Sequence, residues 1–253
     1  MGNKVIVDLT KLESVGAEDL LRWSIDTFSD KFAIVTSFQT EGTILVDMAS
    51  RISPRVRVVA VDTGRLPKET LDMVEVIRSR YGFRAEIIRP DPAEVNTMTA
   101  VHGQDLFYQG VPLRMLCCEL RKVRPLEKFL KGVDAWAVGL RREQSETRSS
   151  VAKVASENGR WKIAPIADWT AQQVAAYVRE HDVPRHPLYE RGYTSIGCAP
   201  CTRAVTPGED ERAGRWWWEQ SADKECGIHF SADGKARRTV DVLLEEVLAR
   251  QNA

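Results

Sequence analysis

The sequence predicts an α/β fold with a mostly parallel, doubly wound β-sheet, and three observations support this prediction. Short apolar stretches such as Val56–Val61 alternate with segments whose apolar residues recur at helical spacing. These stretches are almost continuously apolar, as is typical of strands that helices cover on both faces. Polar turns follow the strands at Ser37–Gly42, Asp62–Arg65 and Gly139–Arg148. Ligands bind beyond the carboxyl ends of the strands in such sheets, so we expect the three turns to border one cleft.

The N-terminal half holds three predicted strands and four predicted helices. The strands are Lys31–Ser37, Val56–Val61 and Ala85–Ile88, and the helices are Ala17–Phe28, Thr43–Ile52, a segment between Pro67 and Gly82, and one near Glu94–Val101. Pro67 suits the first position of a helix, and Gly82 suits the position just past its end. The inward faces are predicted to hold Leu20, Leu21 and Ile25 in the first helix, and Leu71, Val74, Ile77 and Tyr81 in the third.

The C-terminal half begins with a cysteine-bearing helix predicted at Cys118–Leu130. It continues with strands at Asp134–Leu140 and Trp161–Ile166, a helix at Thr170–His181 with Thr170 as its N-cap, and a last helix at Thr239–Arg250. The charged stretch Arg141–Glu157 is predicted to be a loop. We expect two parts: an α/β domain over residues 1–205, and a C-terminal segment over residues 206–253 that folds over the cleft.

Composition excludes several classes of protein. The chain has 253 residues, 43% of them hydrophobic, which suits one α/β domain with an appendage or two small domains. Its 36 Lys and Arg balance 36 Asp and Glu, so no net field favours nucleic acid or a membrane surface. There is neither an apolar run long enough for a membrane span nor a signal core, so no membrane association is expected. Five cysteines, an odd number, indicate intracellular thiols and a cytoplasmic protein.

The cysteines form two pairs and one remainder. Cys117 and Cys118 are adjacent, Cys198 and Cys201 form a Cys-x-x-Cys pair, and Cys226 is left over. Neighbouring side chains diverge, which suits a cluster better than one tetrahedral ion, and four thiolates are the usual complement of a [4Fe–4S] cluster. A zinc site, or buried thiols beside a separate redox pair, are the alternatives.

Four motifs together make the chain resemble the cluster-containing adenylyl-sulfate reductases of assimilatory sulfur metabolism. They are Cys117-Cys118 with Arg121-Lys122 and Pro125-Leu126, Cys198-x-x-Cys201, Gly139-Leu140-Arg141-Arg142-Glu143-Gln144-Ser145, and Lys224-Glu225-Cys226-Gly227-Ile228-His229. The resemblance implies an adenine-nucleotide α-hydrolase-like fold. It also implies thioredoxin-dependent reduction of adenylyl sulfate to sulfite and AMP, for cysteine biosynthesis, by way of an S-sulfocysteine. The cluster-free branch of this family reduces 3′-phosphoadenylyl sulfate and lacks the paired cysteines, so their presence points to adenylyl sulfate.

The same resemblance assigns roles to individual residues. Cys226 is the nucleophile, which suits the only cysteine outside the pairs, and His229 assists it or contacts the phosphosulfate. The substrate-binding residues are Ser37, Gln39, Val61, Thr63, Lys122, Gly139, Arg148, Arg212 and Arg215. Arg212 and Arg215 would share one face if their segment were helical. Trp216–Trp218 is interpreted as packing of the tail, with a platform for the nucleobase as the less favoured alternative.

Other functions remain as alternatives. One is a reductase of 3′-phosphoadenylyl sulfate or of both substrates. Another is a non-catalytic iron–sulfur sensor that binds nucleotides, although such a module has no use for the isolated thiol of Cys226. A tRNA sulfurtransferase is disfavoured by the neutral net charge. The reductant is thioredoxin or a glutaredoxin-like protein, and both a monomer and a homo-oligomer are compatible with the sequence.

Overall fold

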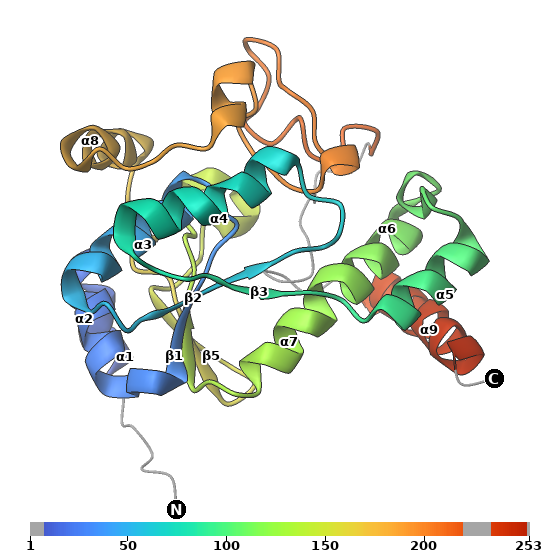
Figure 1. Cartoon of the computed structure of the whole chain (residues 1–253), viewed down its shortest axis with the longest axis horizontal. Helices are drawn as coiled ribbons and strands as arrows, with labels where there is room; N and C mark the ends of the chain where they lie inside the picture. The colour runs from blue at the N-terminus through green and yellow to red at the C-terminus, as the bar shows by residue number, and fades with distance from the viewer. Residues whose placement is uncertain (1–7, 220–233, 252–253) are drawn as a thin grey trace, which may run out of the picture. The chain divides into compact units, whose positions relative to one another are not determined.

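The computed structural model describes residues 8–219 and 234–251, with side chains of the last helix from Thr239 onward (Figure 1). The chain divides into two compact units. The first comprises Met1–Ala60, Asp72–Glu86 and Gly132–His186, and the second comprises Val61–Leu71, Ile87–Lys131 and Pro187–Ala253.

A six-stranded sheet has the order β3-β2-β1-β4-β6-β5. The strands are β1 (Phe32–Val35), β2 (Arg57–Val61), β3 (Glu86–Ile88), β4 (Ala135–Ala137), β5 (Val154–Glu157) and β6 (Arg160–Ile163). β1 runs parallel to both β2 and β4, β4 runs parallel to β6, and β5 is antiparallel to β6. The predicted α/β class with a mostly parallel sheet is therefore confirmed.

The helices of the first unit follow the predicted amphipathic pattern. They are α1 (Leu9–Glu13), α2 (Ala17–Phe28), α3 (Thr40–Ile52), most of α4 (Lys68–Tyr81) and α8 (Ala171–His181). Leu20 and Leu21 of α2 are fully buried, and each contributes about 1.5–3 kcal/mol to folding by leaving water. Thr170 caps α8 as predicted: its side chain accepts from the Gln173 amide, whose side chain in turn accepts from the Thr170 amide.

Helices and short turns make up the second unit. The helices are α5 (Pro92–His102), α6 (Val111–Cys118), a π-helical turn (Glu119–Val123), α7 (Arg124–Leu130) and α9 (Gly234–Gln251). Short 3₁₀ turns in the chain lie at Ser29–Lys31, Leu106–Tyr108, Arg142–Gln144, Glu146–Arg148, Pro187–Arg191 and Ala199–Cys201. α9 packs against α5 and α6, and their shared core includes Met98, Phe107, Leu116, Trp216 and Val247.

Three sequence predictions need correction. The cysteine pair ends helix α6 rather than opening a helix, because Gly110 and Pro112 start that helix well before it. Arg141–Glu157 is not entirely a loop, since it ends in β5. Asn158 and Gly159 both have positive φ, as in the tight turns that join antiparallel strands, and they fold β5 onto β6.

The third correction concerns the inward face of α4. Leu71 was predicted to face inward, but 40% of its surface is exposed. Met73 is buried instead, together with the correctly predicted Ile77. These two lie four residues apart and so share one stripe of the helix, which Leu71 does not join.

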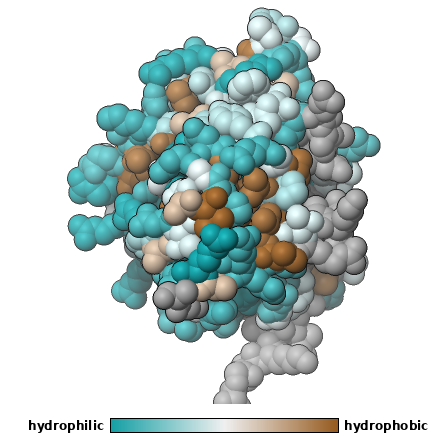
Figure 2. Space-filling view, turned by 90° about the vertical axis from the view of Figure 1, so that its right-hand side faces the viewer, coloured by the Kyte–Doolittle hydropathy of each residue, from teal (hydrophilic) through white to brown (hydrophobic). Residues whose placement is uncertain are grey.

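No helix in the described part of the chain combines the length and apolarity needed to cross a membrane. Figure 2 faces the right-hand side of Figure 1, where α5, α6 and α9 lie, and shows hydrophobic side chains gathered among hydrophilic ones.

Candidate active site and metal centre

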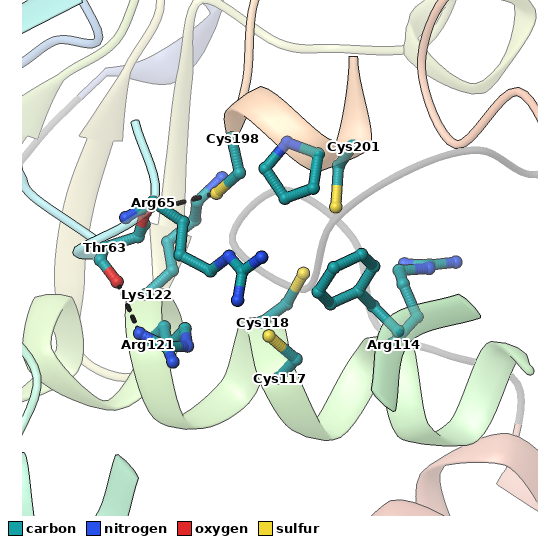
Figure 3. A pocket seen from close by; sticks show the side chains of 11 residues that line it. Thr63, Arg65, Arg114, Cys117, Cys118, Arg121, Lys122, Cys198 and Cys201 are labelled. Carbon is teal, nitrogen blue, oxygen red and sulfur yellow. Dashed lines mark hydrogen bonds between the residues drawn. The ribbon is translucent and has the colours of Figure 1, made fainter. Parts of the chain in front are cut away.

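The four paired cysteines line one pocket in the second unit (Figure 3). Cys117 and Cys118 end α6, while Cys198 and Cys201 stand at the two ends of a short 3₁₀ turn. Cys117 and Cys201 are buried, the other two are half-buried, and none of the four is in a disulfide bond within the described residues. Two cysteine pairs eighty residues apart in sequence therefore meet in space.

Thr63 links the two cysteine segments. Arg121, one turn after Cys117, donates from Nη1 to the Thr63 carbonyl oxygen at 3.0 Å. The Thr63 hydroxyl lies 3.2 Å from Cys198 Sγ, within hydrogen-bonding distance. Figure 3 shows both contacts as dashed lines. The turn after β2 thus fixes the helix that carries one pair relative to the turn that carries the other.

Arg65, which also lines the pocket, connects further segments around it. Its carbonyl oxygen accepts from the Ala199 amide at 2.8 Å, and its guanidinium donates to the Gln104 carbonyl and to Asp105 Oδ1 at 3.1 and 3.0 Å. The guanidinium also lies over the Phe107 ring, 5.0 Å from its centroid. One side chain therefore joins the turn after β2 to the segment between α5 and α6.

Positive charge surrounds the thiols. Arg65, Arg114, Arg121 and Lys122 line the same pocket, and Nε of the buried Arg121 has no hydrogen-bond partner among the described residues. Burial raises the pKa of the Cys117 thiol, an effect that Arg121 partly opposes. Burial, together with the nearby Cys198 and Cys117 sulfurs, raises the pKa of Cys201 to about 12. Thiolates here need cations or a bound metal to offset their charge.

The donor set fits the predicted cluster. Four soft sulfur ligands come from two segments. Cationic side chains line the same pocket, where they would offset the negative charge of a thiolate-ligated cluster. Within the described residues, His, Cys, Asp and Glu form no group of three or more arranged to hold a single metal ion.

Part of the predicted substrate set also lies in the second unit. Lys122 and Thr63 both line the cysteine pocket. Val61 ends β2, directly before the turn that Thr63 belongs to.

Arg212 lies in a turn and Arg215 in an isolated β-bridge, so the condition of a helical segment, under which they would share one face, is not met. Arg215 pairs through its backbone with Thr202, next to Cys201. Its buried guanidinium lies 4.6 Å from the Trp216 ring centroid and donates to Ser195 Oγ at 3.4 Å. A Cβ at position 197 would strike this guanidinium, so Gly197 leaves the space that Arg215 occupies.

The other part of the predicted set lies in the first unit, around the N-terminus of α3. Gln39 precedes the helix, and its side-chain amide donates to Ser37 Oγ at 2.9 Å. A Cβ at Gly139 would come within 2.7 Å of the Glu41 carbonyl carbon and the Gly42 nitrogen, so only glycine allows this close approach. The N-terminal end of a helix carries partial positive charge and favours anions.

Gln144 connects the loop after β4. Its side-chain oxygen accepts from the Arg141 amide at 3.1 Å and from the buried Arg148 guanidinium at 2.5 Å. Arg141 in turn donates to Glu41 Oε1 at 3.0 Å. The predicted phosphate contact Arg148 is therefore connected through hydrogen bonds to the start of α3.

Some predicted residues lie elsewhere, and some pocket residues were missed. Cys226 and His229 fall outside the described residues. Trp216 is buried in the core, which confirms the packing interpretation for that residue. Sequence reasoning assigned no role to Arg65, Arg114 or Arg121. Arg121 carried a signal in its spacing of four residues from Cys117, and Arg65 in its place in the polar turn Asp62–Arg65 that follows a predicted strand.

Comparisons with known proteins agree with one another. A model of the phosphoadenosine phosphosulfate reductase domain matches residues 31–204. The chain is 46% identical over 202 residues to the adenosine 5′-phosphosulfate reductase of Allochromatium vinosum, covering 79% of each chain. It is 44% identical over 215 residues to the enzyme of the same name from Burkholderia cepacia, covering 84% of this chain and 86% of that one.

Solved structures show the same likeness. Phosphoadenylyl-sulfate reductase from Candida auris, in a phosphate complex, superimposes with a TM-score of 0.67 and 27% identity over 81% of this chain and 100% of that one. FMN adenylyltransferase from Candida glabrata, in complex with FAD and inorganic pyrophosphate, has a TM-score of 0.52 and 10% identity over 91% of this chain and 87% of that one. The latter is a likeness of fold alone and agrees with the predicted adenine-nucleotide α-hydrolase-like architecture.

Proposed function

The chain belongs to the phosphoadenosine phosphosulfate reductase family, and from this premise we propose that it is an adenylyl-sulfate reductase. It reduces adenylyl sulfate to sulfite and AMP in sulfate assimilation and cysteine biosynthesis. The observation that carries the proposal is the pocket that gathers Cys117, Cys118, Cys198 and Cys201 among four cations. Relatives at 44–46% identity bear the name adenosine 5′-phosphosulfate reductase.

The four pocket thiols, as thiolates, would hold a [4Fe–4S] cluster. Bound there, the cluster would supply a compact negative centre with redox capacity beside the basic side chains. Arg121 and Lys122 would offset that charge. Arg65 and Thr63 would keep the two cysteine segments in place, because both link the Cys198 turn to neighbouring segments.

The proposed substrate contacts follow the family resemblance. The α-phosphate would lie at the N-terminus of α3 near Ser37, Gln39 and Gly139, with Arg148 as a further cation. Val61 and Thr63 would contact the adenosine. Lys122, Arg212, Arg215 and His229 would bind the sulfate and stabilise the charge that develops during transfer.

The proposed reaction takes three steps. The Cys226 thiolate attacks the sulfur of adenylyl sulfate, and the S–O bond breaks with AMP as the leaving group. A reductant thiolate then attacks Sγ of this S-sulfocysteine, and sulfite leaves with the electron pair of the broken S–S bond. The second reductant thiol attacks the mixed disulfide and releases Cys226 as a thiolate. The dithiol supplies both electrons.

Residues 206–253 would form the catalytic tail that brings Cys226 to the substrate. The reductant is thioredoxin or a glutaredoxin-like protein, and the enzyme would work in the cytoplasm, where such dithiols are kept reduced.

Incubation with adenylyl sulfate and no reductant tests the proposal. The intact chain should gain about 80 Da, the mass of SO3, on the peptide that holds Cys226, and release AMP. Reduced thioredoxin should remove the adduct and liberate sulfite. Cys226→Ser should form no adduct, yet it should retain the brown colour expected of an iron–sulfur protein and about four iron and four sulfide per chain. A non-catalytic sensor would bind nucleotide without forming the adduct, and an adduct on Cys198 or Cys201 would refute the assigned roles.

Reduction of 3′-phosphoadenylyl sulfate is the second candidate. It is favoured by the description of the matching family model and by the likeness to the Candida auris enzyme of that name. The paired cysteines favour adenylyl sulfate, and sulfite formation from each substrate separates the two.

A further inference from the structure

Four aromatic side chains connect the cysteine pocket to the surface of the second unit. Phe107 lines the pocket, and its ring centroid lies 4.6 Å from that of Tyr108. Tyr108 lies 4.4 Å from Trp218, and Trp218 lies 5.6 Å from Trp217. We call these four residues the aromatic cluster.

The outer end of the aromatic cluster is exposed. Trp217 retains 48% and Tyr108 retains 45% of their surface, although Phe107 beneath them is buried. Leu9, Leu71, Val76 and Val242 are the other large apolar side chains described as exposed, and all are aliphatic. Trp and Tyr are the residues most enriched at the energetic centres of protein interfaces, so exposed rings in one cluster indicate a binding surface.

The aromatic cluster is held rigidly from beneath. The Tyr108 hydroxyl donates to the Pro200 carbonyl at 3.0 Å, within the Cys-x-x-Cys turn. Arg65 covers Phe107, and Trp218 packs against the core of the unit. Binding of a partner to Trp217 and Tyr108 therefore costs little side-chain entropy in these two residues, because their rings are already ordered.

The number of residues between Trp217 and Cys226 limits how far this surface can lie from the proposed nucleophile. Trp217 precedes Cys226 by nine residues, so even a fully extended chain keeps the two within about 32 Å. A protein that attacks Cys226 must therefore dock within that reach of Trp217. A small protein contacts its partner over a patch of comparable dimensions, roughly 800 Å² on each side.

We propose that Trp217 and Tyr108 form the docking surface for the protein dithiol that regenerates Cys226. This inference rests on the proposed function. The partner is a thioredoxin-class protein: one of its thiolates attacks Sγ of the S-sulfocysteine, sulfite leaves with the electron pair, and its second thiol then frees Cys226. The aromatic rings bind the apolar surface around that dithiol and take no part in the transfer from adenylyl sulfate.

The test separates docking from chemistry by steady-state kinetics. Trp217→Ser should raise the KM for thioredoxin about tenfold, as expected for loss of an aromatic interface residue. The rate of adduct formation without reductant, and the KM for adenylyl sulfate, should stay as in the unaltered enzyme. Turnover driven by a small dithiol, which needs no docking surface, should also be unchanged. Tyr108→Phe keeps the ring but loses the bond to Pro200 and should raise the KM for thioredoxin less than Tyr108→Ser.

Val76→Ser on α4 is the matched control, since it removes a similarly exposed apolar side chain outside the aromatic cluster. It should leave the KM for thioredoxin unchanged. An unchanged KM in Trp217→Ser, or an equal rise in Val76→Ser, would overturn the proposal. A raised KM for adenylyl sulfate would instead assign Trp217 to the nucleotide, and a change in oligomeric state would assign the surface to a second copy of the chain. Absence of the adduct in the unaltered enzyme would refute the proposed function itself.

Discussion

Arg114 and Glu219 form a buried ion pair across more than a hundred residues of sequence. Nε and Nη2 of Arg114 donate to the two carboxylate oxygens of Glu219 at 2.9 and 3.1 Å, and the side chains are only 3% and 4% exposed. The guanidinium also lies 4.5 Å from the Trp216 ring centroid. The pair fixes the chain directly after the three tryptophans to helix α6, at the edge of the cysteine pocket.

Breaking this pair from one side should destabilise the enzyme strongly. Arg114→Met leaves a buried carboxylate without its partner, and we expect a loss of about 3–5 kcal/mol in the free energy of unfolding. The double variant Arg114→Met, Glu219→Leu should recover most of that loss, because an apolar pair needs no charge compensation. Urea unfolding measures both, and a double variant as unstable as the single one would contradict the prediction.

Glu246→Gln provides the control for this experiment. It breaks the exposed pair with Arg250 on α9, where solvent screens the interaction, and should hardly move the unfolding midpoint.

Gly139→Ala should weaken nucleotide binding in the first unit. The new Cβ would lie 2.7 Å from backbone atoms of Glu41 and Gly42, so the start of α3 must shift. A shift of about 1 Å at a phosphate site costs roughly ten- to a hundredfold in kcat/KM. Kinetics with adenylyl sulfate test this expectation. Gly16→Ala is the control, since the nearest atom to its Cβ is Asp19 Oδ2 at 3.8 Å, and equal losses in both variants would exclude the steric explanation.

The alternation of apolar stretches with helical patterns was enough to predict the parallel part of the sheet, because it reflects burial on both faces. The antiparallel strand β5 was missed, although Asn158-Gly159 is a local hairpin signal, because the charge of the preceding stretch was given more weight. The contact of Arg65 with Gln104 and the pairing of Arg114 with Glu219 had no local signal. These contacts depend on which distant segments meet in the fold. The spacing of residues along the chain does not encode that information.

Tyr177 should give the first unit a distinct response to alkaline pH. Its hydroxyl donates to Oδ2 of the buried Asp47 at 2.6 Å. Burial, followed by this bond, raises the pKa of Tyr177 above its ordinary value of about 10, while Arg51 opposes the shift. The raised pKa means that the folded state holds the proton more tightly than the unfolded state does. Its stabilising contribution is therefore complete below pH 10 and falls as the pH rises toward the folded pKa.

Urea unfolding at pH 8 and at pH 11 checks this expectation. The unaltered enzyme should lose more stability between the two values than Tyr177→Phe, which has no proton to release. In a parallel titration followed by tyrosinate absorbance, the variant should have one tyrosine fewer among those that ionise only above the ordinary tyrosine pKa. Identical pH dependence in the two proteins would show that Tyr177 titrates normally.

The enzyme should prefer adenylyl sulfate to 3′-phosphoadenylyl sulfate. In the loop after β4, Arg141 already donates to Glu41 and Arg142 to the Val151 carbonyl, and Arg148 is assigned to the α-phosphate, so none of these three cations is dedicated to a 3′-phosphate. A charged group left without partners costs a few kcal/mol, so kcat/KM should be roughly two orders of magnitude lower for the phosphorylated substrate.

Sulfite formation with saturating thioredoxin measures the ratio of kcat/KM for the two substrates. Competition by AMP and by adenosine 3′,5′-bisphosphate separates binding from chemistry. AMP should be the stronger inhibitor. Equal efficiency on both substrates would show instead that the site accommodates the additional phosphate.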